Sequence, residues 1–392
     1  MNILNQIRKT AEEYPQEPAI ITSSDGQVFT YAETYRRMKA GEQLPIPLLG
    51  SSWEGDFILH TTGTTGKSKS VIISQRAVMA NSDNLITAHG YTHEQVMLIT
   101  GPMDHLGCWS KLFPTLISGG TLYIIEDGMK NVNDFFKPFN LMPERRFATF
   151  LVPSALRILL SQAQDRLAAH AASIDFIEAG GAPLPRPDML RLCEILPKSR
   201  LFNTYASTET GVIATYNYND GRCLSGCVGH TMRHSCVMIT REGTIACKGD
   251  TLMSGYENDE ELTKQAMHDD TFFTADSGWI DEEGMLHIGG RTDDIINVGG
   301  LKLAPQEVEE AALANPMVND CICIAEPHPI LGQAPALLLV LAEGYTLDKR
   351  ALARHINDRL DRYKVPQKYT VVESIEKTPN GKINRKAYRE KQ

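Results

Sequence analysis

Apolar positions repeat along the chain with two different periods, and the two patterns alternate between about residues 55 and 215. Short runs rich in Val, Ile, Phe and Tyr are typical of buried strands, whereas the longer runs with apolar residues every three or four positions are typical of helices. The strand-like runs are 56–62, 94–101, 121–127, 148–153, 174–181 and 200–207, and the helical runs are 77–90, 106–120, 154–171 and 185–198. Strands that alternate with helices predict an α/β fold, with a parallel sheet flanked by helices.

The pattern changes twice outside this segment. Residues 3–14 have the period of a short amphipathic helix, with Ile3, Leu4, Ile7 and Ala11 on one face. From 212 to 290 we expect short strands with glycine turns and no helices, a β-rich subdomain that includes a hairpin turning at Glu242-Gly243. From 292 onward strands and helices return, and 335–344 is predicted to be a buried strand.

A charged, glycine-rich segment, "GGRTDDIINVGG" (289–300), marks a change in composition. We place a domain boundary there. The predicted architecture is a large N-terminal domain (1–291), with the parallel sheet and the β-rich subdomain, followed by a small, mobile α+β domain (292–392).

Composition narrows the function classes. The chain has 392 residues and a formal net charge of -9, and it concentrates no Lys and Arg, so we expect no nucleic-acid partner. No apolar run is long enough to span a bilayer, and the N-terminus has no secretory signal pattern. With eight cysteines, the chain is expected to be cytoplasmic with reduced thiols. A zinc site in the cysteine- and histidine-containing segment 223–236 is an unfavoured alternative, because the segment lacks a paired CxxC knuckle.

The stretch "LHTTGTTGKSKSVIIS" (59–74) suggests a phosphate-binding loop. A Walker loop needs a glycine at position 61, which is Thr61, and it needs a following helix, whereas "SVIIS" reads as a strand. The stretch is therefore predicted to be a Gly-Thr-Ser loop between two strands, a hairpin-like flap. Its backbone N–H groups and hydroxyls suit a phosphate chain, although a solvated turn is an equally good interpretation of this loop alone.

Four further motifs follow in order: "NTYASTE" (203–209), "TAD" (274–276), "GGRTDDIINVGGLKLAP" (289–305) and "TPNGKINRK" (378–386). Together with the loop, they resemble the adenylate-forming superfamily of acyl- and aryl-CoA synthetases, peptide-synthetase adenylation domains and luciferases. The resemblance extends from Leu59 to Lys386 and implies the family's two-domain fold. It also implies an AMP-forming acid–thiol ligase that uses ATP and Mg²⁺.

The resemblance also implies roles for individual residues. Glu209 would carry Mg²⁺, Thr208 would bond the α-phosphate, and Lys382 would bridge the carboxylate and the α-phosphate. Tyr205 would stack on adenine, and Asp276 with Arg291 would hold the ribose. The complete implied ATP site is Thr61, Thr62, Gly63, Thr64, Thr65, Gly66, Lys69, Gly180, Gly181, Ala182, Asn203, Tyr205, Asp276 and Arg291.

The acid and its acceptor are less constrained. His105, Trp109, Phe150 and Val152 are the candidate lining of an acid pocket, which suits an aryl or medium aliphatic acid. The acceptor would be the pantetheine thiol of CoA or of a carrier protein. In the family the C-terminal domain turns at a hinge that matches Asp293, and Gly299 and Gly300 would let the pantetheine arm pass close to backbone.

The chain also departs from the family pattern. Ser68 and Ser70 replace the usual Pro and Gly of the loop, and about sixty residues precede the loop where relatives have well over a hundred. Most of the first N-terminal subdomain is therefore missing, and a partner chain, such as a second copy in a homodimer, would cover the exposed face. Three alternatives stay open: an amino-acid-activating enzyme that loads a carrier protein (suggested by Asp104), a non-catalytic nucleotide- or adenylate-binding homologue, and an unrelated kinase.

Overall fold

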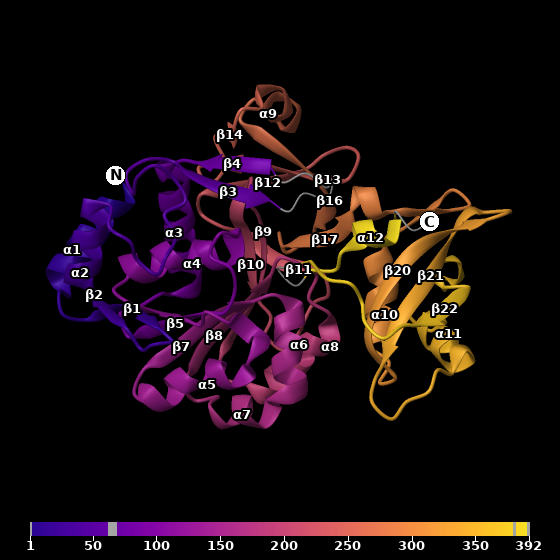
Figure 1. Ribbon diagram of the computed structural model, residues 1–392. Coiled ribbons are helices and arrows are strands. Elements are labelled where there is room, and N and C mark those ends of the chain that lie inside the picture. Colours follow the sequence, from indigo (N-terminus) through magenta and orange to yellow (C-terminus); the bar gives the residue numbers. More distant parts are fainter. Residues whose placement is uncertain (1, 62–68, 379–381, 390–392) are drawn as a thin grey trace.

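The computed structural model describes residues 2–61, 69–378 and 382–389. Figure 1 shows a large body built by the indigo-to-salmon part of the chain and a smaller orange-to-yellow body beside it. The mixed α/β class predicted from the sequence is confirmed. Within the described residues, no helix combines the length and the apolar composition that a membrane crossing would need.

The centre of the large body is a run of parallel strands. In spatial order these are β1 (Pro18–Thr22), β6 (Thr121–Ile124), β5 (Gln95–Ile99), β7 (Arg146–Leu151), β8 (Ile174–Gly180) and β9 (Arg200–Ser207). A short strand β2 (Val28–Thr30) closes one edge by antiparallel pairing with β1. Because parallel strands end at the same edge of a sheet, the residues that follow β7, β8 and β9 meet there.

Helices cover both faces of this sheet, and alternate residues of the central strand β5 serve the two faces. Met97 and Ile99 belong to one apolar core, whereas Val96 and Leu98 belong to the other. This division follows from the period of two in a strand. The first core packs under α1 (Ile3–Glu13), α2 (Tyr31–Ala40), α3 (Gln75–His89) and α4 (Leu106–Ile117), and the second under α5 (Val132–Leu141), α6 (Pro153–Gln162), α7 (Gln164–Ala169) and α8 (Arg186–Ile195).

Antiparallel strands extend the sheet beyond β9, as predicted for the β-rich subdomain. They are β10 (Gly211–Asn217), β11 (Cys227–Thr231), β17 (Leu286–Arg291), β16 (Thr271–Ile280), β13 (Thr244–Gly249) and β12 (Ser235–Ile239), with β15 (Met267–His268) on β16. The hairpin between β12 and β13 turns at Gly243, which has a φ of +79°. The expectation of no helix was wrong, because α9 (Glu260–Ala266) forms in this segment behind the side-chain cap of Asp259.

Strand β3 (Phe57–Thr61) was expected in the parallel sheet, and that placement was wrong. It pairs antiparallel with β4 (Lys69–Ile73), which also pairs with β14 (Gly255–Tyr256) in a separate three-stranded sheet. Local pairing across a short loop prevails over the distant sheet. The predicted flap between two strands is therefore confirmed, although residues 62–68 themselves lie outside the described part.

The C-terminal body has its own sheet and core. Its strands are β19 (Leu301–Leu303), β18 (Ile296–Val298), β21 (Gly332–Leu341) and β20 (Val318–His328), with β22 (Lys368–Val371) parallel to β21. Its helices and turns are η2 (Thr292–Asp294), α10 (Pro305–Leu313), α11 (Lys349–Asn357), η3 (Arg362–Lys364) and α12 (Arg385–Arg389), and a further 3-10 turn, η1 (Gly128–Lys130), lies in the large body. The predicted strand at 335–344 is the core of β21, where Leu337 and Leu339 are buried.

Candidate active site

The C-terminal end of β8 is the meeting point of several predicted site residues. A Cβ atom built at Gly181 would lie 3.2 Å from Cε and 3.6 Å from Nζ of Lys382, and 3.8 Å from Cγ1 of Val152. Gly181 also has a φ of +79°, a conformation that favours glycine. A residue two hundred positions later in the chain is therefore held directly above this glycine.

Lys382 reaches this position from a short antiparallel turn. Its carbonyl oxygen accepts a hydrogen bond from the Thr378 N–H at 2.7 Å, and Lys377 and Ile383 form an isolated β-bridge. Three residues further on, the guanidinium of Arg385 donates to Glu309 of α10 at 2.6 Å and lies 3.6 Å from Asp294. The segment that carries Lys382 is thereby anchored to the rest of the C-terminal body.

The electrostatic surroundings of Lys382 are mixed. Burial lowers the pKa of its amine, and the nearby positive charge of Arg291 acts in the same direction. The carboxylates of Asp276 and Glu209 oppose this shift and favour the charged amine. The structure thus brings Lys382, Asp276, Glu209 and Gly181 into one site, although they come from four separate segments.

Asp276 lies where β16 pairs with β17, directly opposite Arg291. The Tyr205 hydroxyl donates to Asp276 Oδ2 at 2.6 Å, and Arg291 Nη1 lies 3.7 Å from Oδ1. Burial, followed by the Asp276 charge, raises the pKa of Tyr205 well above its usual value, so the phenol stays a donor. Tyr205 and Arg291 together hold the Asp276 carboxylate in place.

Glu209 follows Thr208 after β9, and its carboxylate is held by a residue that the sequence analysis did not name. The Tyr256 hydroxyl, on β14, donates to Glu209 Oε1 at 3.0 Å, and the Met253 N–H donates to the Glu209 carbonyl oxygen at 2.8 Å. Lys69 Nζ lies 5.1 Å from the centre of the Tyr256 ring, a distance at which a cation–π contact is favourable. The three-stranded sheet therefore connects the flap to the carboxylate.

These residues suit a nucleotide and a divalent cation. Among the described residues, the Thr61 hydroxyl oxygen at the base of the flap is buried without a hydrogen-bond partner, which leaves it available to a ligand. Carboxylate oxygen is the ligand that Mg²⁺ prefers, and Glu209 supplies one next to the Tyr256 hydroxyl. Thr62, Gly63, Thr64, Thr65 and Gly66 lie outside the described residues.

Three predicted residues do not face this site. Asn203 is buried, and its amide donates to the Cys227 carbonyl oxygen at 2.7 Å, between β9 and β11. Trp109 was expected to line the acid pocket, but it is 1% exposed and packs in the core against Phe57 and Phe113. Gly180 is likewise buried, where a Cβ would lie 2.9 Å from the Thr204 carbonyl oxygen.

The Phe150 ring packs against two glycines where the acid pocket was predicted. Cβ atoms built at Gly107, in the first turn of α4, and at Gly180 would lie 2.4 Å and 3.3 Å from the Phe150 ring. Behind the ring, 5.2 Å from its centre, is the fully buried amine of Lys111, which donates to Glu178 at 2.7 Å. His105, at the start of α4, is 24% exposed and lies 4.0 Å from Asp104.

The proposed hinge residue contacts the site through Arg291, whereas the two glycines are exposed. Asp293 Oδ2 accepts from Arg291 Nη2 at 3.0 Å within the 3-10 turn η2. Gly299 and Gly300 are exposed, with φ values of +60° and +92°, in the turn between β18 and β19. In this arrangement, Lys382 is inside the site and the two glycines are outside it.

Sequence reasoning missed Tyr256 and Arg385, which hold Glu209 and the Lys382 segment. Tyr256 lies in none of the five motifs, and its role depends on the pairing of β14 with β4. Arg385 lies within the motif at 378–386, but its role depends on the packing of that segment against Glu309 of α10. The unfavoured zinc cluster does not converge. Cys223 Sγ lies 3.6 Å from Cys193 Sγ, whereas His234 contacts Asp83 at 2.8 Å.

Family models match both parts of the chain. Residues 51–257 match the model described as AMP-binding enzyme, and residues 307–382 match the AMP-binding enzyme C-terminal domain. The protein belongs to the family of AMP-binding enzymes, and the resemblance to adenylate-forming enzymes drawn from its five motifs is confirmed.

Curated relatives are CoA ligases. The chain is 28% identical to the sulfoacetate--CoA ligase of Cupriavidus necator, over 84% of this chain and 65% of the relative. It is 27% identical to a 2-succinylbenzoate--CoA ligase of Bacillus cereus, over 94% of this chain and 76% of the relative. The chain thus spans somewhat less than two thirds of the length of the first of these proteins.

Solved structures of similar fold include ATP-bound MatB from Rhodopseudomonas palustris, with a TM-score of 0.77 and 26% identity over 94% of this chain and 73% of that one. The o-succinylbenzoate CoA synthetase MenE from Bacillus subtilis, in complex with an acyl-adenylate intermediate, has a TM-score of 0.81 and 21% identity over 98% of each chain. At that identity, the likeness to MenE concerns the fold alone.

Proposed function

We propose that this protein is an AMP-forming acid–thiol ligase. A carboxylate oxygen attacks the α-phosphorus of ATP, and pyrophosphate leaves, which gives an acyl adenylate. A thiolate then attacks the acyl carbon, AMP leaves, and the thiol proton passes to solvent. The observation that carries the proposal is the position of Lys382, which the C-terminal body holds against Gly181, where the charges of Asp276 and Glu209 act on its amine.

The side chains divide the first half-reaction between them. Lys382 places one positive charge where a carboxylate and a phosphate, both anionic, have to approach each other. Asp276, fixed by Tyr205 and Arg291, would accept the ribose hydroxyls. Glu209 would hold Mg²⁺, which neutralises phosphate charge when bound. The carboxylate of Glu209 is already oriented by Tyr256.

The acceptor half-reaction requires a different arrangement. Gly299 and Gly300 would let a pantetheine arm pass close to backbone, but they are exposed while Lys382 occupies the site. We infer that the C-terminal body, residues 292–392, turns about Asp293 between the two half-reactions. CoA is the acceptor suggested by the names of the relatives, and a carrier-protein pantetheine has the same thiol.

The acid is limited by Phe150. The aryl or medium aliphatic acid expected from the sequence has to lie beside His105 and Val152, because the ring of Phe150 fills the space between Gly107 and Gly180. We therefore favour the slimmer members of that range. Lys111 is neutralised by Glu178 behind the ring, so it offers no free charge to a second acidic group of the substrate.

The test is a panel of carboxylic acids with Mg·ATP and hydroxylamine. Hydroxamate capture reports the adenylate without any acceptor, and pyrophosphate release reports the same step independently. We expect AMP and pyrophosphate in equal amounts with at least one acid. If nucleotide binds but no acid in a broad panel yields pyrophosphate, the protein is a binding homologue, and ADP as the product would indicate a kinase.

A further inference from the structure

An ion-pair cluster outside the candidate active site joins the two bodies of the chain. Arg157 of α6 and Asp188 of α8 belong to the large body, whereas Asp320 of β20 and Lys377 belong to the C-terminal body. Helices α6 and α8 lie on the side of the large body that faces β20 and α10 (Figure 1). Across this boundary, Arg157 Nη1 donates to Asp320 Oδ1 at 3.2 Å. We call these four residues the Arg157 cluster.

Each residue that crosses the boundary also has a partner of opposite charge in its own body. Arg157 Nε donates to Asp188 Oδ2 at 2.8 Å, and Lys377 Nζ lies 3.0 Å from Asp320 Oδ2. The side chains of Arg157 and Asp320 are only 24% and 13% exposed. Breaking an ion pair away from water is normally costly because it leaves a charge uncompensated. Here each body would keep a neutral pair, so the contact can open without leaving either charge unpaired.

Lys377 connects this cluster to Lys382. Lys377 forms a β-bridge with Ile383, the residue after Lys382, and the neighbouring Thr378 N–H donates to the Lys382 carbonyl oxygen. Asp320 therefore holds one side of the turn that carries Lys382. Its own rotamer is fixed by the Cys321 N–H, which donates to Asp320 Oδ1 at 3.0 Å. A single carboxylate thus links the large body to the segment that presents the amine.

We propose that Asp320 is a positioning residue for Lys382. With Arg157, it holds the C-terminal body in the arrangement that places Lys382 above Gly181, and its separation from Arg157 accompanies the turn to the acceptor half-reaction. The inference rests on the proposed function for the chemical step that it serves, but not for the arrangement of the two bodies.

A second contact across the boundary differs in kind. The Ser225 hydroxyl donates to Glu310 of α10, but it brings no opposite charge to that carboxylate. Hydrogen bonds between charged groups contribute more than those with a neutral partner. We therefore assign the hold on the C-terminal body to the Arg157 cluster rather than to Ser225.

A kinetic test compares Arg157→Gln, Asp320→Asn and the double variant. Hydroxamate formation should fall about 10-fold or more, as for the loss of a charge-assisted hydrogen bond, while thioester formation from prepared acyl adenylate should stay within about twofold of wild type. Because both changes break one contact, the double variant should lose no more than Asp320→Asn alone. Arg157→Lys, which keeps the charge, should recover most of the rate. The matched control is Arg222→Gln, whose partners Asp220 and Glu283 both lie in the large body.

The control should react like the wild type. Equal loss in both half-reactions, or effects that multiply in the double variant, would mean that the two residues serve the fold or act separately, and would refute the assignment.

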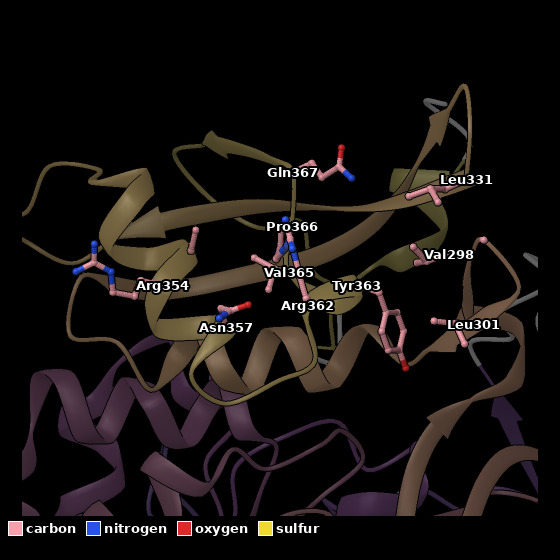
Figure 2. A pocket seen from close by; sticks show the side chains of 12 residues that line it. Val298, Leu301, Leu331, Arg354, Asn357, Arg362, Tyr363, Val365, Pro366 and Gln367 are labelled. Atoms are coloured by element: carbon pink, nitrogen blue, oxygen red, sulfur yellow. The ribbon is translucent and has the colours of Figure 1, made fainter.

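A second experiment reads the arrangement of the two bodies without any reaction. Cys236 is exposed, whereas the other cysteines are buried or half-buried, and Arg354 of α11 is exposed at one end of the surface pocket in Figure 2. Dyes at Cys236 and at Arg354→Cys report the distance between the bodies by single-molecule energy transfer. We expect one dominant transfer efficiency in this labelled protein. Asp320→Asn, which leaves Arg157 paired with Asp188, should lower the ratio of that state to all others about 10-fold.

The two experiments separate this inference from the proposed function. An unchanged distribution of transfer efficiencies in Asp320→Asn would overturn the positioning role, whether or not the protein is a ligase. Failure of hydroxamate formation in the wild type would count against the proposed function, while the energy-transfer measurement would still decide whether Asp320 holds the two bodies together.

Discussion

Replacing Lys382 by Ala removes the amine that the C-terminal body places above Gly181. The side chain is half-buried, and the carboxylates whose charges act on its amine, Asp276 and Glu209, belong to the proposed nucleotide site. The change should therefore leave folding and ATP binding nearly unaffected. Its effect should fall on the step in which a carboxylate approaches the α-phosphate.

The size of the effect follows from the chemistry of that step. A preorganised donor or charge that acts mainly in the transition state contributes a factor of about 10²–10³, or about 3–4 kcal/mol. Burial lowers the pKa of Lys382, although two nearby carboxylates oppose this shift. The amine is therefore partly removed from water, and an electrostatic contact is stronger in such surroundings. We expect Lys382→Ala to reduce hydroxamate formation by that factor.

The assay separates the two half-reactions. Adenylation is measured by hydroxamate capture, and thioester formation is measured by supplying chemically prepared acyl adenylate and the thiol. Lys382→Ala should fail the first assay and pass the second, because Lys382 leaves the site when Gly299 enters. Lys368→Ala, which removes a surface lysine paired with Glu326 on another strand, is the matched control. Equal loss in both assays, or in neither, would refute the reasoning.

The pH dependence provides a second check on Lys382. Burial lowers the pKa of this amine below its ordinary value, and the amine is charged only below its pKa. Adenylation that requires the cation should therefore decline on the alkaline side at a pH below about 10.4, the usual pKa of lysine. Lys382→Arg, if active, should abolish this decline, because a guanidinium stays charged throughout the range. An unchanged alkaline limb would assign the titration to another group.

The remaining predictions concern three other positions. Glu209→Gln should nearly abolish adenylation and raise the Mg²⁺ concentration required, since it removes the proposed metal ligand, and near-normal rates at ordinary Mg²⁺ would contradict that role. Asp293→Pro should spare hydroxamate formation and impair thioester formation, because proline fixes φ at the proposed hinge; equal effects on both would count against rotation there. Phe150→Ala should shift the preference in the acid panel towards bulkier acids and cost about 3–5 kcal/mol of unfolding free energy at most, measured by denaturant titration. An unchanged acid profile in the folded variant would show that Phe150 does not limit the pocket.

Much of the fold was accessible from sequence because its signals are local. The strands from β5 to β9 carry continuous apolar runs, the helices between them have a helical period, and Gly243 marks its hairpin. The flap was also predictable, since "SVIIS" has the composition of a strand and Thr61 excludes a Walker loop. These features depend on residues that are only a few positions apart, so they can be recognised in the sequence itself.

The sequence by itself also determined which residue types were available for the chemistry: Lys382, Asp276, Glu209 and the glycines of the flap. The family resemblance implied that the first three share one site, but only the tertiary structure shows which contacts hold them, because no local pattern records a contact between segments that are distant in the sequence. The tertiary packing also buries Trp109 in the core and makes the Tyr256 hydroxyl a hydrogen-bond donor to Glu209. It places the Phe150 ring against Gly107 and Gly180. Which face of a helix or strand is buried depends on the partner that packs against it. Which element packs there depends on the tertiary fold of the whole chain.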